Sequence, residues 1–486
     1  MINWLLLVPA ALVIIVLAFL WARTSTDQFE PRTFPRHAGA SRVAGLSAIL
    51  VRAELPILVL TLPLFLFTSP WTVLALAAIP LLWGARRLAR GYLLPHTPLD
   101  WPIALMALMI PVGLLVSPYF SWGVGRATLL IYGIALYYAL VDWIVNRHTF
   151  DIALSLYLLA GGAMALLALI GTDWQYKFPF LGDLTQALPR IANTLSRDQT
   201  GFHPNIVAGA LLWAIFPLLA LLLSPARENT DPAPSGSRLS TWLASLSYGR
   251  LPLVILLLLT AGTLVLTQSR GAIAGAAAGV GLLAWLRWPR FRPAIAVGAV
   301  AAVALVSVAL TLEISVAKQT VAAGQFSVSA AENFAVRIDT WQSALRAISA
   351  HPVEGIGLDA FRHLLPTTYP AASIPDTYDI GHAHNQFLQA ALDLGLPGLL
   401  AYLTLWIAAG RMLWLMLARN TPLSTGSPRT IYLAAGVATA LFASFLHGMI
   451  DVVVMVSKPG VLFWAMLAFI TALGNLTAKQ RESTLQ

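Results

Sequence analysis

The sequence predicts an all-α fold, a polytopic transmembrane bundle of about 12–13 spans with a large external helical loop between late spans. Composition is the first reason: 58% of the 486 residues are hydrophobic and 10% are charged, whereas soluble domains are about a quarter charged. Pattern is the second, because many apolar runs approach about 20 residues, enough to cross a bilayer as a helix. The runs are continuous rather than alternating, which excludes a β-barrel.

The third reason is the placement of the basic residues. The formal net charge is +9, but the arginines stand in short loops between apolar runs, as in membrane proteins, so no nucleic-acid partner is expected. The chain has no cysteine, which excludes disulfides, a thiolate nucleophile and a cysteine metal site.

Residues 1–171 form the first expected part, the N-terminal transmembrane helices. Ile2–Trp21 is interpreted as a retained anchor, because it lacks the basic start of a cleaved signal peptide. Leu55–Thr68 and Trp71–Trp83 are expected to be a close helical pair, with Val43–Leu50 extending the first. The remaining spans of this part are Leu99–Ser117, Val124–Val145 and Phe150–Gly171.

Residues 172–312 form the second part, central transmembrane helices with an arginine-bearing outer loop. The loop contains Arg190 and Arg197, and Arg270 stands in a tight turn between two apolar spans. An arginine there is costly unless it is paired or faces a polar cavity, so Arg270 is a candidate for function. The expected spans are Phe202–Leu223, Leu251–Leu266, Gly271–Trp288 and Pro293–Leu312.

Residues 313–382 form the third part, the large external loop. Ser329 and Glu332 fit a capping box that would begin a helix, and His351–Pro352 would end it. One face of that helix carries an apolar stripe, made of Phe334, Ile338, Trp341, Leu345 and Ile348. A turn at Gly355 and Gly357, a short helix at Leu358–Leu365 and an irregular lid at Thr367–Gly381 are expected to follow.

Residues 383–486 form the fourth part, a helix carrying the candidate catalytic motif and the C-terminal spans Leu396–Leu417, Ile431–Ile450 and Val461–Leu473. His384 and Asn385 precede apolar residues at helical spacing, so both are expected in the first turn of a short helix. Gly395 can end that helix and Pro397 can begin the next one. A helix N-terminus attracts anions and disfavours imidazolium, so His384 is expected to be neutral and able to accept a proton.

Orientation follows from the arginines and lysines. If residues 313–382 are external, loops such as Arg86–Arg90 fall inside, with roughly two thirds of the positive charge. Thirteen spans would then put the N-terminus outside and the C-terminus inside. Basic residues on the outer side are not needed for topology and are the better functional candidates: Arg126, Lys177, Arg190, Arg197, Arg270, Lys318, Arg337, Arg346, Arg362 and Lys458.

His384 and Asn385 are followed after nine residues by Gly395 and, three positions later, by Gly398. With this pattern the chain resembles the O-antigen ligase superfamily, whose signature it matches. Three further stretches resemble it in order and spacing: Gly201–Asn205, Ser269–Ala272, and the loop segment with Arg337–Trp341 and His351–Phe361.

The resemblance implies a glycosyltransferase on the outer face of the cytoplasmic (inner) membrane, acting without a metal or cofactor. The donor would be a glycan on undecaprenyl diphosphate, and the acceptor a hydroxyl of lipid A core, a growing polymer or a protein. His384 would be the general base, with Arg270 and one of Arg190, Arg197 or Arg337 on the diphosphate. Membrane lipids surround the chain as further partners, and the candidate substrate-binding residues also include His382, His203, Asn205 and Asn385.

Several alternatives stay open. His382 could only shape the turn, His203 and Asn205 could cap the span that begins there, and Arg337 could only pair with Glu332 or Asp339. His447 and Asp451, four residues apart, are interpreted as a buried polar pair, with a proton relay as the alternative. Within the superfamily, ligase, polymerase and protein O-glycosyltransferase are not separated. A transporter or flippase of lipid-linked glycans would need no base, but the chain shows no convincing internal repeat of the kind that transporters carry.

Overall fold

The computed structural model describes residues 42–174, 179–188, 202–225, 237–305, 334–371, 374–375, 379–418, 427–455 and 457–485. Over these residues the chain is helical and has no strand, apart from an isolated bridge between Thr172 and Phe202. The predicted all-α class is therefore confirmed. Several sequence-based expectations concern positions outside the described residues: the span Ile2–Trp21, the capping box at Ser329 and the residues Arg190 and Arg197.

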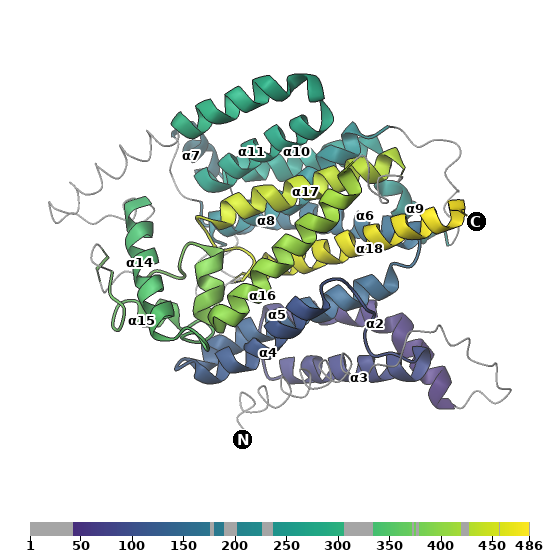
Figure 1. The fold of residues 1–486 in the computed structure, drawn as a ribbon, viewed down its shortest axis with the longest axis horizontal. Helices are drawn as coiled ribbons and strands as arrows, with labels where there is room; N and C mark the ends of the chain where they lie inside the picture. Colours follow the sequence, from purple (N-terminus) through teal and green to yellow (C-terminus); the bar gives the residue numbers. More distant parts are fainter. Residues whose placement is uncertain are drawn as a thin grey trace. The chain divides into compact units, whose positions relative to one another are not determined.

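Most of the described helices are long, and Figure 1 labels them in chain order. They are α2 (Arg42–Leu66), α3 (Thr72–Arg90), α4 (Asp100–Val116), α5 (Phe120–Trp143), α6 (Arg147–Gly171), α7 (Pro179–Gln186), α8 (Pro204–Leu223), α9 (Arg238–Leu246), α10 (Arg250–Leu266), α11 (Arg270–Arg287), α14 (Phe334–Ala350), α15 (Phe361–Leu364), α16 (Gln386–Leu417), α17 (Pro428–Gly448) and α18 (Val461–Leu485), with 3₁₀ turns at η3 (Pro289–Phe291) and η4 (Lys458–Gly460).

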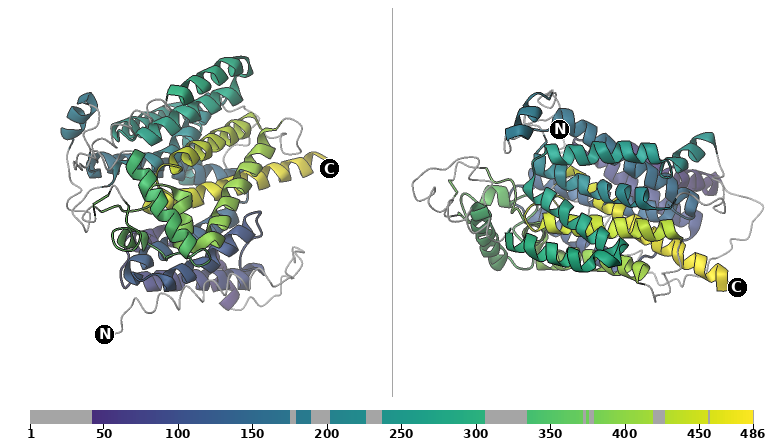
Figure 2. Two further views of the ribbon diagram at one scale, coloured as in Figure 1. Left: turned by 60° about the vertical axis from the view of Figure 1, so that its left-hand side comes forward. Right: turned by 90° about the horizontal axis from the view of Figure 1, so that it is seen from above.

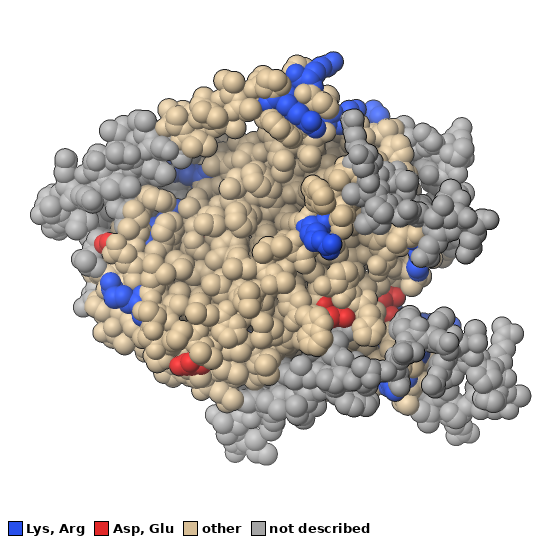
Figure 3. Space-filling view, in the orientation of Figure 1, with Lys and Arg blue, Asp and Glu red and all other residues tan. Residues whose placement is uncertain are grey.

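Eight of the described helices are long and apolar enough to cross a membrane, or nine if α9 and α10, bent by 58°, form one span. Exposed apolar side chains such as Leu258 and Ile407 suit contact with lipid. Figure 3 shows a described surface with few charges over most of the face in view. Helix α2 begins at Arg42, which agrees with the expected extension by Val43–Leu50, whereas α3 continues to Arg90, past the expected end at Trp83.

The chain divides into two compact units, of which unit 1 comprises residues 1–143, 347–363 and 390–405. In it, α5 packs against α2, α3 and α4. Arg86, interpreted from sequence as a loop charge, has no exposed surface. It forms ion pairs with Glu54 and with Asp142 at 3.4 Å, because a buried guanidinium is tolerated only when it is paired.

Residues 352–359 of unit 1, which we call the clasp, are tied to α4 and α16 by backbone hydrogen bonds. Ile356 donates to the carbonyl of Leu392 at 2.9 Å, Leu358 to that of Gly113 at 2.8 Å, and Leu396 of α16 to that of Pro352 at 2.8 Å. Arg126, a functional candidate from sequence, pairs with Asp359 of the clasp and lies 3.8 Å from Asp393 of α16.

Helix α16 breaks at Gly395, where φ is +67° and ψ is 179°. This break agrees with the expectation that Gly395 ends one helix and Pro397 begins another. Helix α14 ends at Ala350, as His351–Pro352 predicted. The second helix of that loop is shorter than expected and covers only Phe361–Leu364.

Unit 2 comprises residues 144–346, 364–389 and 406–486 and is built around α8. Helix α8 contacts α6, α10, α11, α17 and α18, and its Trp213 and Phe216 are fully buried. Figures 1 and 2 show α8 and α17 lying side by side.

The helices of unit 2 define two ends. At the basic end, Arg147 of α6 donates to Thr430 of α17 at 3.1 Å, and Arg429 donates to Ser247 at 2.8 Å. At the opposite end lie the start of α8, the start of α11 and the end of α17. His447 of α17 and the carbonyl of Asn205 on α8 lie 3.3 Å apart there. We call this the site end.

Candidate active site

His384 lies directly before the N-cap of α16. It was expected inside the first helical turn, but that interpretation is wrong by one residue: its φ of +48° is left-handed, and Asn385 is the N-cap. Histidine is among the few non-glycine residues that adopt this conformation. The indole N–H of Trp341 on α14 donates to the His384 carbonyl at 3.3 Å and helps to hold the turn.

The side chain of Asn385 forms hydrogen bonds with the free backbone N–H groups at the start of α16. Its side-chain oxygen accepts from the N–H groups of Phe387 and Leu388 at 2.9 and 3.1 Å, and its amide nitrogen donates to the Met449 carbonyl at 3.0 Å. Those helix N–H groups are therefore used by the cap and do not point freely at a substrate anion, contrary to expectation. A direct substrate role for Asn385 stays a prediction.

His382 both shapes the turn and faces a carboxylate. The backbone N–H of His384 donates to Nδ1 of His382 at 3.2 Å. Since that nitrogen accepts, the neutral ring of His382 carries its proton on Nε2. Nε2 lies 3.6 Å from Oδ1 of Asp451, so the N–H is directed at that carboxylate.

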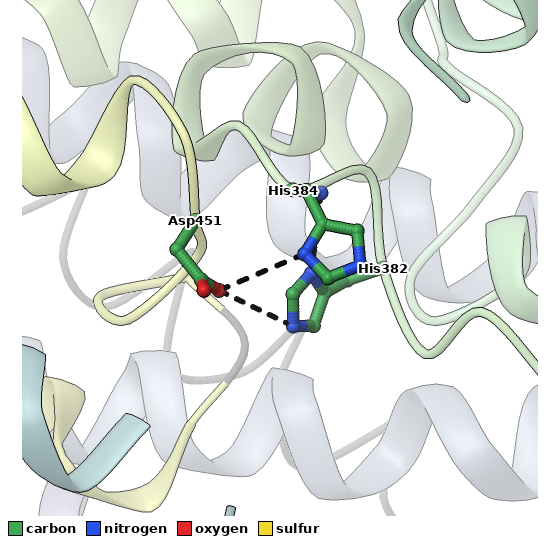
Figure 4. Close-up of side chains that lie close together, drawn as sticks. All are labelled: His382, His384 and Asp451. Carbon is green, nitrogen blue, oxygen red and sulfur yellow. Dashed lines mark hydrogen bonds and ion pairs between the residues drawn. The ribbon is translucent and has the colours of Figure 1, made fainter. Parts of the chain in front are cut away.

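Asp451 joins the two histidines from another part of the chain. It follows α17, it is 2% exposed, and its Oδ1 lies 4.0 Å from Nδ1 of His384. Figure 4 shows the imidazoles of His382 and His384 on one side and the Asp451 carboxylate facing both. The backbone N–H of Val452 donates to the same oxygen at 2.8 Å and orients the carboxylate.

The electrostatics keep His384 neutral. Burial lowers its pKa to about 4; Asp451 acts in the opposite direction, and the charges of Arg337 and His203 add to the lowering. Burial alone would raise the pKa of Asp451, but His382, His384, His447 and Arg337 outweigh it and hold that pKa below its usual range. The pair therefore consists of an anionic carboxylate and a neutral imidazole.

Close helix packing supports the cluster from behind. The Nε2 of His447 lies 3.3 Å from the carbonyl of Asn205, so that nitrogen carries the proton. A Cβ on Gly209 would lie 2.7 Å from the His447 ring, and one on Gly271 would lie 3.1 Å from its Nδ1. A side chain at either place would require neighbouring atoms to shift, so the two glycines let α8 and α11 approach α17 closely.

The remaining candidate residues differ in how closely they are connected to this cluster. His203 caps α8, and its Nδ1 accepts from the N–H of Asn205 at 3.3 Å. Arg337 on α14 affects the pKa of both His384 and Asp451, and its Nε is buried without a hydrogen-bond partner among the described residues. Arg270 is exposed at the start of α11, next to Gly271 and thus at the site end. Arg190 and Arg197 lie outside the described residues.

The cluster has the residue types of a metal site, since ligand atoms of His382, His384 and Asp451 lie within 4.8 Å of one another. The hydrogen bond that Nδ1 of His382 accepts disfavours metal binding by this cluster. A metal would need the lone pair of Nε2, which holds the proton in this tautomer. The arrangement suits proton transfer better than ligation of a cation.

The position of Asp451 beside His382 and His384 was not predicted. From sequence it was interpreted with His447, four residues away, as a buried polar pair, and a proton relay was only the alternative. The sequence feature that could have identified Asp451 is its place at the site end of a span. Burying an acidic side chain there is costly unless it has a functional or structural partner.

The family model for O-antigen ligase matches residues 255–403, which include Arg270, Arg337, His382 and His384. No curated protein matches the chain.

Proposed function

Because residues 255–403 place this multi-pass membrane protein in the O-antigen ligase superfamily, we propose that it transfers a glycan from undecaprenyl diphosphate to an acceptor hydroxyl. His384 is the general base of this reaction. Arg270 and Arg337 bind the diphosphate, and Arg190 or Arg197 is a further candidate for that contact. The acceptor is lipid A core, a growing polysaccharide or a protein hydroxyl.

The observation that carries the proposal is a neutral imidazole held beside an anionic carboxylate. His384 has its pKa lowered to about 4, so it is deprotonated at neutral pH and can accept a proton. Its Nδ1 side faces Asp451, which leaves Nε2 for the acceptor hydroxyl. When His384 takes the proton, Asp451 stabilises the imidazolium.

The bond changes balance without a further reagent. The acceptor oxygen forms a bond to the anomeric carbon while its proton passes to His384. The bond from that carbon to the diphosphate oxygen breaks, and the electron pair leaves with the lipid diphosphate. Guanidinium groups stabilise this added negative charge by charge-assisted hydrogen bonds. The buried Nε of Arg337, which has no hydrogen-bond partner among the described residues, is suited to one of them.

The proposed setting is the cytoplasmic membrane, with the site on its external, periplasmic face. The basic end of unit 2 carries Arg147, Arg250, Arg287 and Arg429. The positive-inside rule directs such an end to the cytoplasm. The cluster of His382, His384 and Asp451 lies at the site end of the same unit, and so faces the opposite compartment.

The test is complementation of a deletion strain with the wild-type gene or with His384→Ala. Lipid-linked, polymerised and protein-attached glycans would be profiled separately. The variant should lose transfer by about 10²- to 10⁴-fold, the usual contribution of a general base. The glycan class that disappears identifies the acceptor.

His96→Ala is the matched control, because His96 is an exposed histidine of unit 1 that is not part of the proposed site. It should restore the wild-type profile at equal expression. Full activity of His384→Ala would refute the base assignment. Loss of purified activity in EDTA, restored by a divalent cation, would make the cluster a metal site instead.

A detergent assay separates transfer from transport. Free lipid diphosphate and extended acceptor should both accumulate where no membrane divides two compartments. If neither forms while glycolipid still crosses vesicle membranes, the chain is a transporter.

A further inference from the structure

A hollow of about 290 Å³ lies at the basic end of unit 2, away from the histidine cluster. Its wall is formed by the start of α6, the start of α17 and the last turns of α18. The residues that matter to the argument are Asn146, Arg147, Thr430, Leu473, Leu476 and Lys479.

The charge of the hollow is positive. Arg147 and Lys479 line it, and none of its described lining residues is acidic. Asp151 lies 3.4 Å from Arg147, but it is also 3.9 Å from Arg429 and accepts a hydrogen bond from Tyr248 at 2.9 Å. One carboxylate therefore faces two guanidinium groups, and a net positive charge remains beside the hollow.

Polar donors and apolar side chains stand on different parts of the wall. The side-chain oxygen of Asn146 caps α6 by accepting from the N–H of Thr149 at 3.0 Å, which leaves its amide N–H groups as donors. Leu473 and Leu476 belong to α18 and give the hollow an apolar side. A ligand with an anionic group and an attached hydrocarbon chain matches both.

The position of the hollow relative to the ends of the spans also indicates a lipid. The candidate span Arg147–Gly171 begins at Arg147, and the span Lys458–Lys479 ends at Lys479. The hollow thus lies where two spans leave the hydrocarbon region, at the level of the phosphate headgroups. Basic pockets between transmembrane helices are a known setting for acidic lipid headgroups.

We propose that this hollow binds the phosphate headgroup of an anionic phospholipid, with Arg147 and Lys479 contacting the phosphate and Leu473 and Leu476 contacting an acyl chain. The site is separate from the proposed transfer reaction and does not depend on it.

The test measures lipid binding to the purified full-length protein by native mass spectrometry. Phosphatidylglycerol is the probe and phosphatidylcholine the neutral comparison. Lys479→Gln should weaken binding of the first phosphatidylglycerol about fivefold, the expected contribution of one basic residue at a membrane surface. Lys479 is exposed, so its substitution should leave folding intact, which an unchanged monodisperse elution would establish.

Arg250→Gln is the matched control, since Arg250 is an exposed cation at the start of α10 and does not line the hollow. It should leave the first lipid in place. Equal losses in both variants, or equal binding of phosphatidylcholine, would overturn the proposal. Displacement of the lipid by millimolar inorganic phosphate would also overturn it, because the site would then take a free anion.

Discussion

At the scale of single residues, the protonation state of His384 is set by opposing effects of burial and nearby charges. Asp451 favours its protonated form, whereas burial, Arg337 and His203 favour its neutral form, and the neutral form prevails with a pKa of about 4. As the proposed base, His384 would be deprotonated at every physiological pH, but a base with so low a pKa is weak. In that proposal the nearby carboxylate stabilises the proton once it is transferred.

Arg337→Gln tests this balance. Arg337 lowers the pKa of His384, so its removal should raise that pKa from about 4 toward the ordinary 6.5. Since the base acts when deprotonated, the acidic limb of the pH profile of kcat/KM should move to higher pH. Asp451→Asn should move the limb in the opposite direction, because Asp451 raises the same pKa. The profile would be measured on purified protein in detergent.

Arg346→Gln serves as the control on the same helix. Arg346 donates to the carbonyl of Pro370 at 2.6 Å and to Ser343 at 2.9 Å, and it is not among the groups that shift the pKa of His384. Its substitution should leave the limb where it is. An unmoved limb in Arg337→Gln, or equal shifts in both variants, would contradict the assigned role of Arg337.

At the scale of elements, α16 consists of two arms joined at Gly395. The backbone there, with φ +67° and ψ 179°, is a conformation almost confined to glycine. The clasp occupies the space that a side chain would need, since a Cβ on Gly395 would lie 1.9 Å from the Val353 carbonyl oxygen. The break in α16 and the position of the clasp therefore depend on each other.

Gly395→Ala should therefore destabilise the protein by about 2–5 kcal/mol, the sum of backbone strain and a clash that the clasp must relieve. Thermal unfolding in detergent would record it as a lower Tm. Gly410→Ala, on the second arm of α16, meets nothing within 4 Å. It should be neutral, or stabilising by up to about 1 kcal/mol. If both variants unfold at the wild-type temperature, the close approach of the clasp to Gly395 is wrong.

At the scale of the whole molecule, the two ends of unit 2 differ in charge and chemistry, which predicts their sides of the membrane. The chain has no cysteine, so single cysteines can be introduced without background. Thr367→Cys, in the loop proposed to be external, should react with a membrane-impermeant maleimide in intact spheroplasts. Ser245→Cys, at the basic end, should react only after permeabilisation. The reverse pattern would invert the proposed orientation.

The sequence predicted features that depend on neighbouring residues and failed for those that depend on distant ones. The break in α16 was predictable because Gly395 and Pro397 are close in sequence. The predicted position of His384 was wrong by one residue, because Asn385, whose side chain is the better acceptor, is the N-cap residue of α16. The partnership of Asp451 with His382, the burial of Arg86 and the ion pair of Arg126 with Asp359 arise from segments far apart in the chain. No local pattern encodes them.

The loop that contains α14 has one further consequence, for imaging. A membrane protein of this kind is mostly enclosed by its detergent micelle, which leaves little outside to align particles in electron microscopy. Helix α14 is fixed at Trp341 and Arg346 by hydrogen bonds to the His384 and Pro370 carbonyls. If that loop is external, as proposed, an antibody fragment raised against the exposed face of α14 would be a rigid fiducial on the side of the histidine cluster.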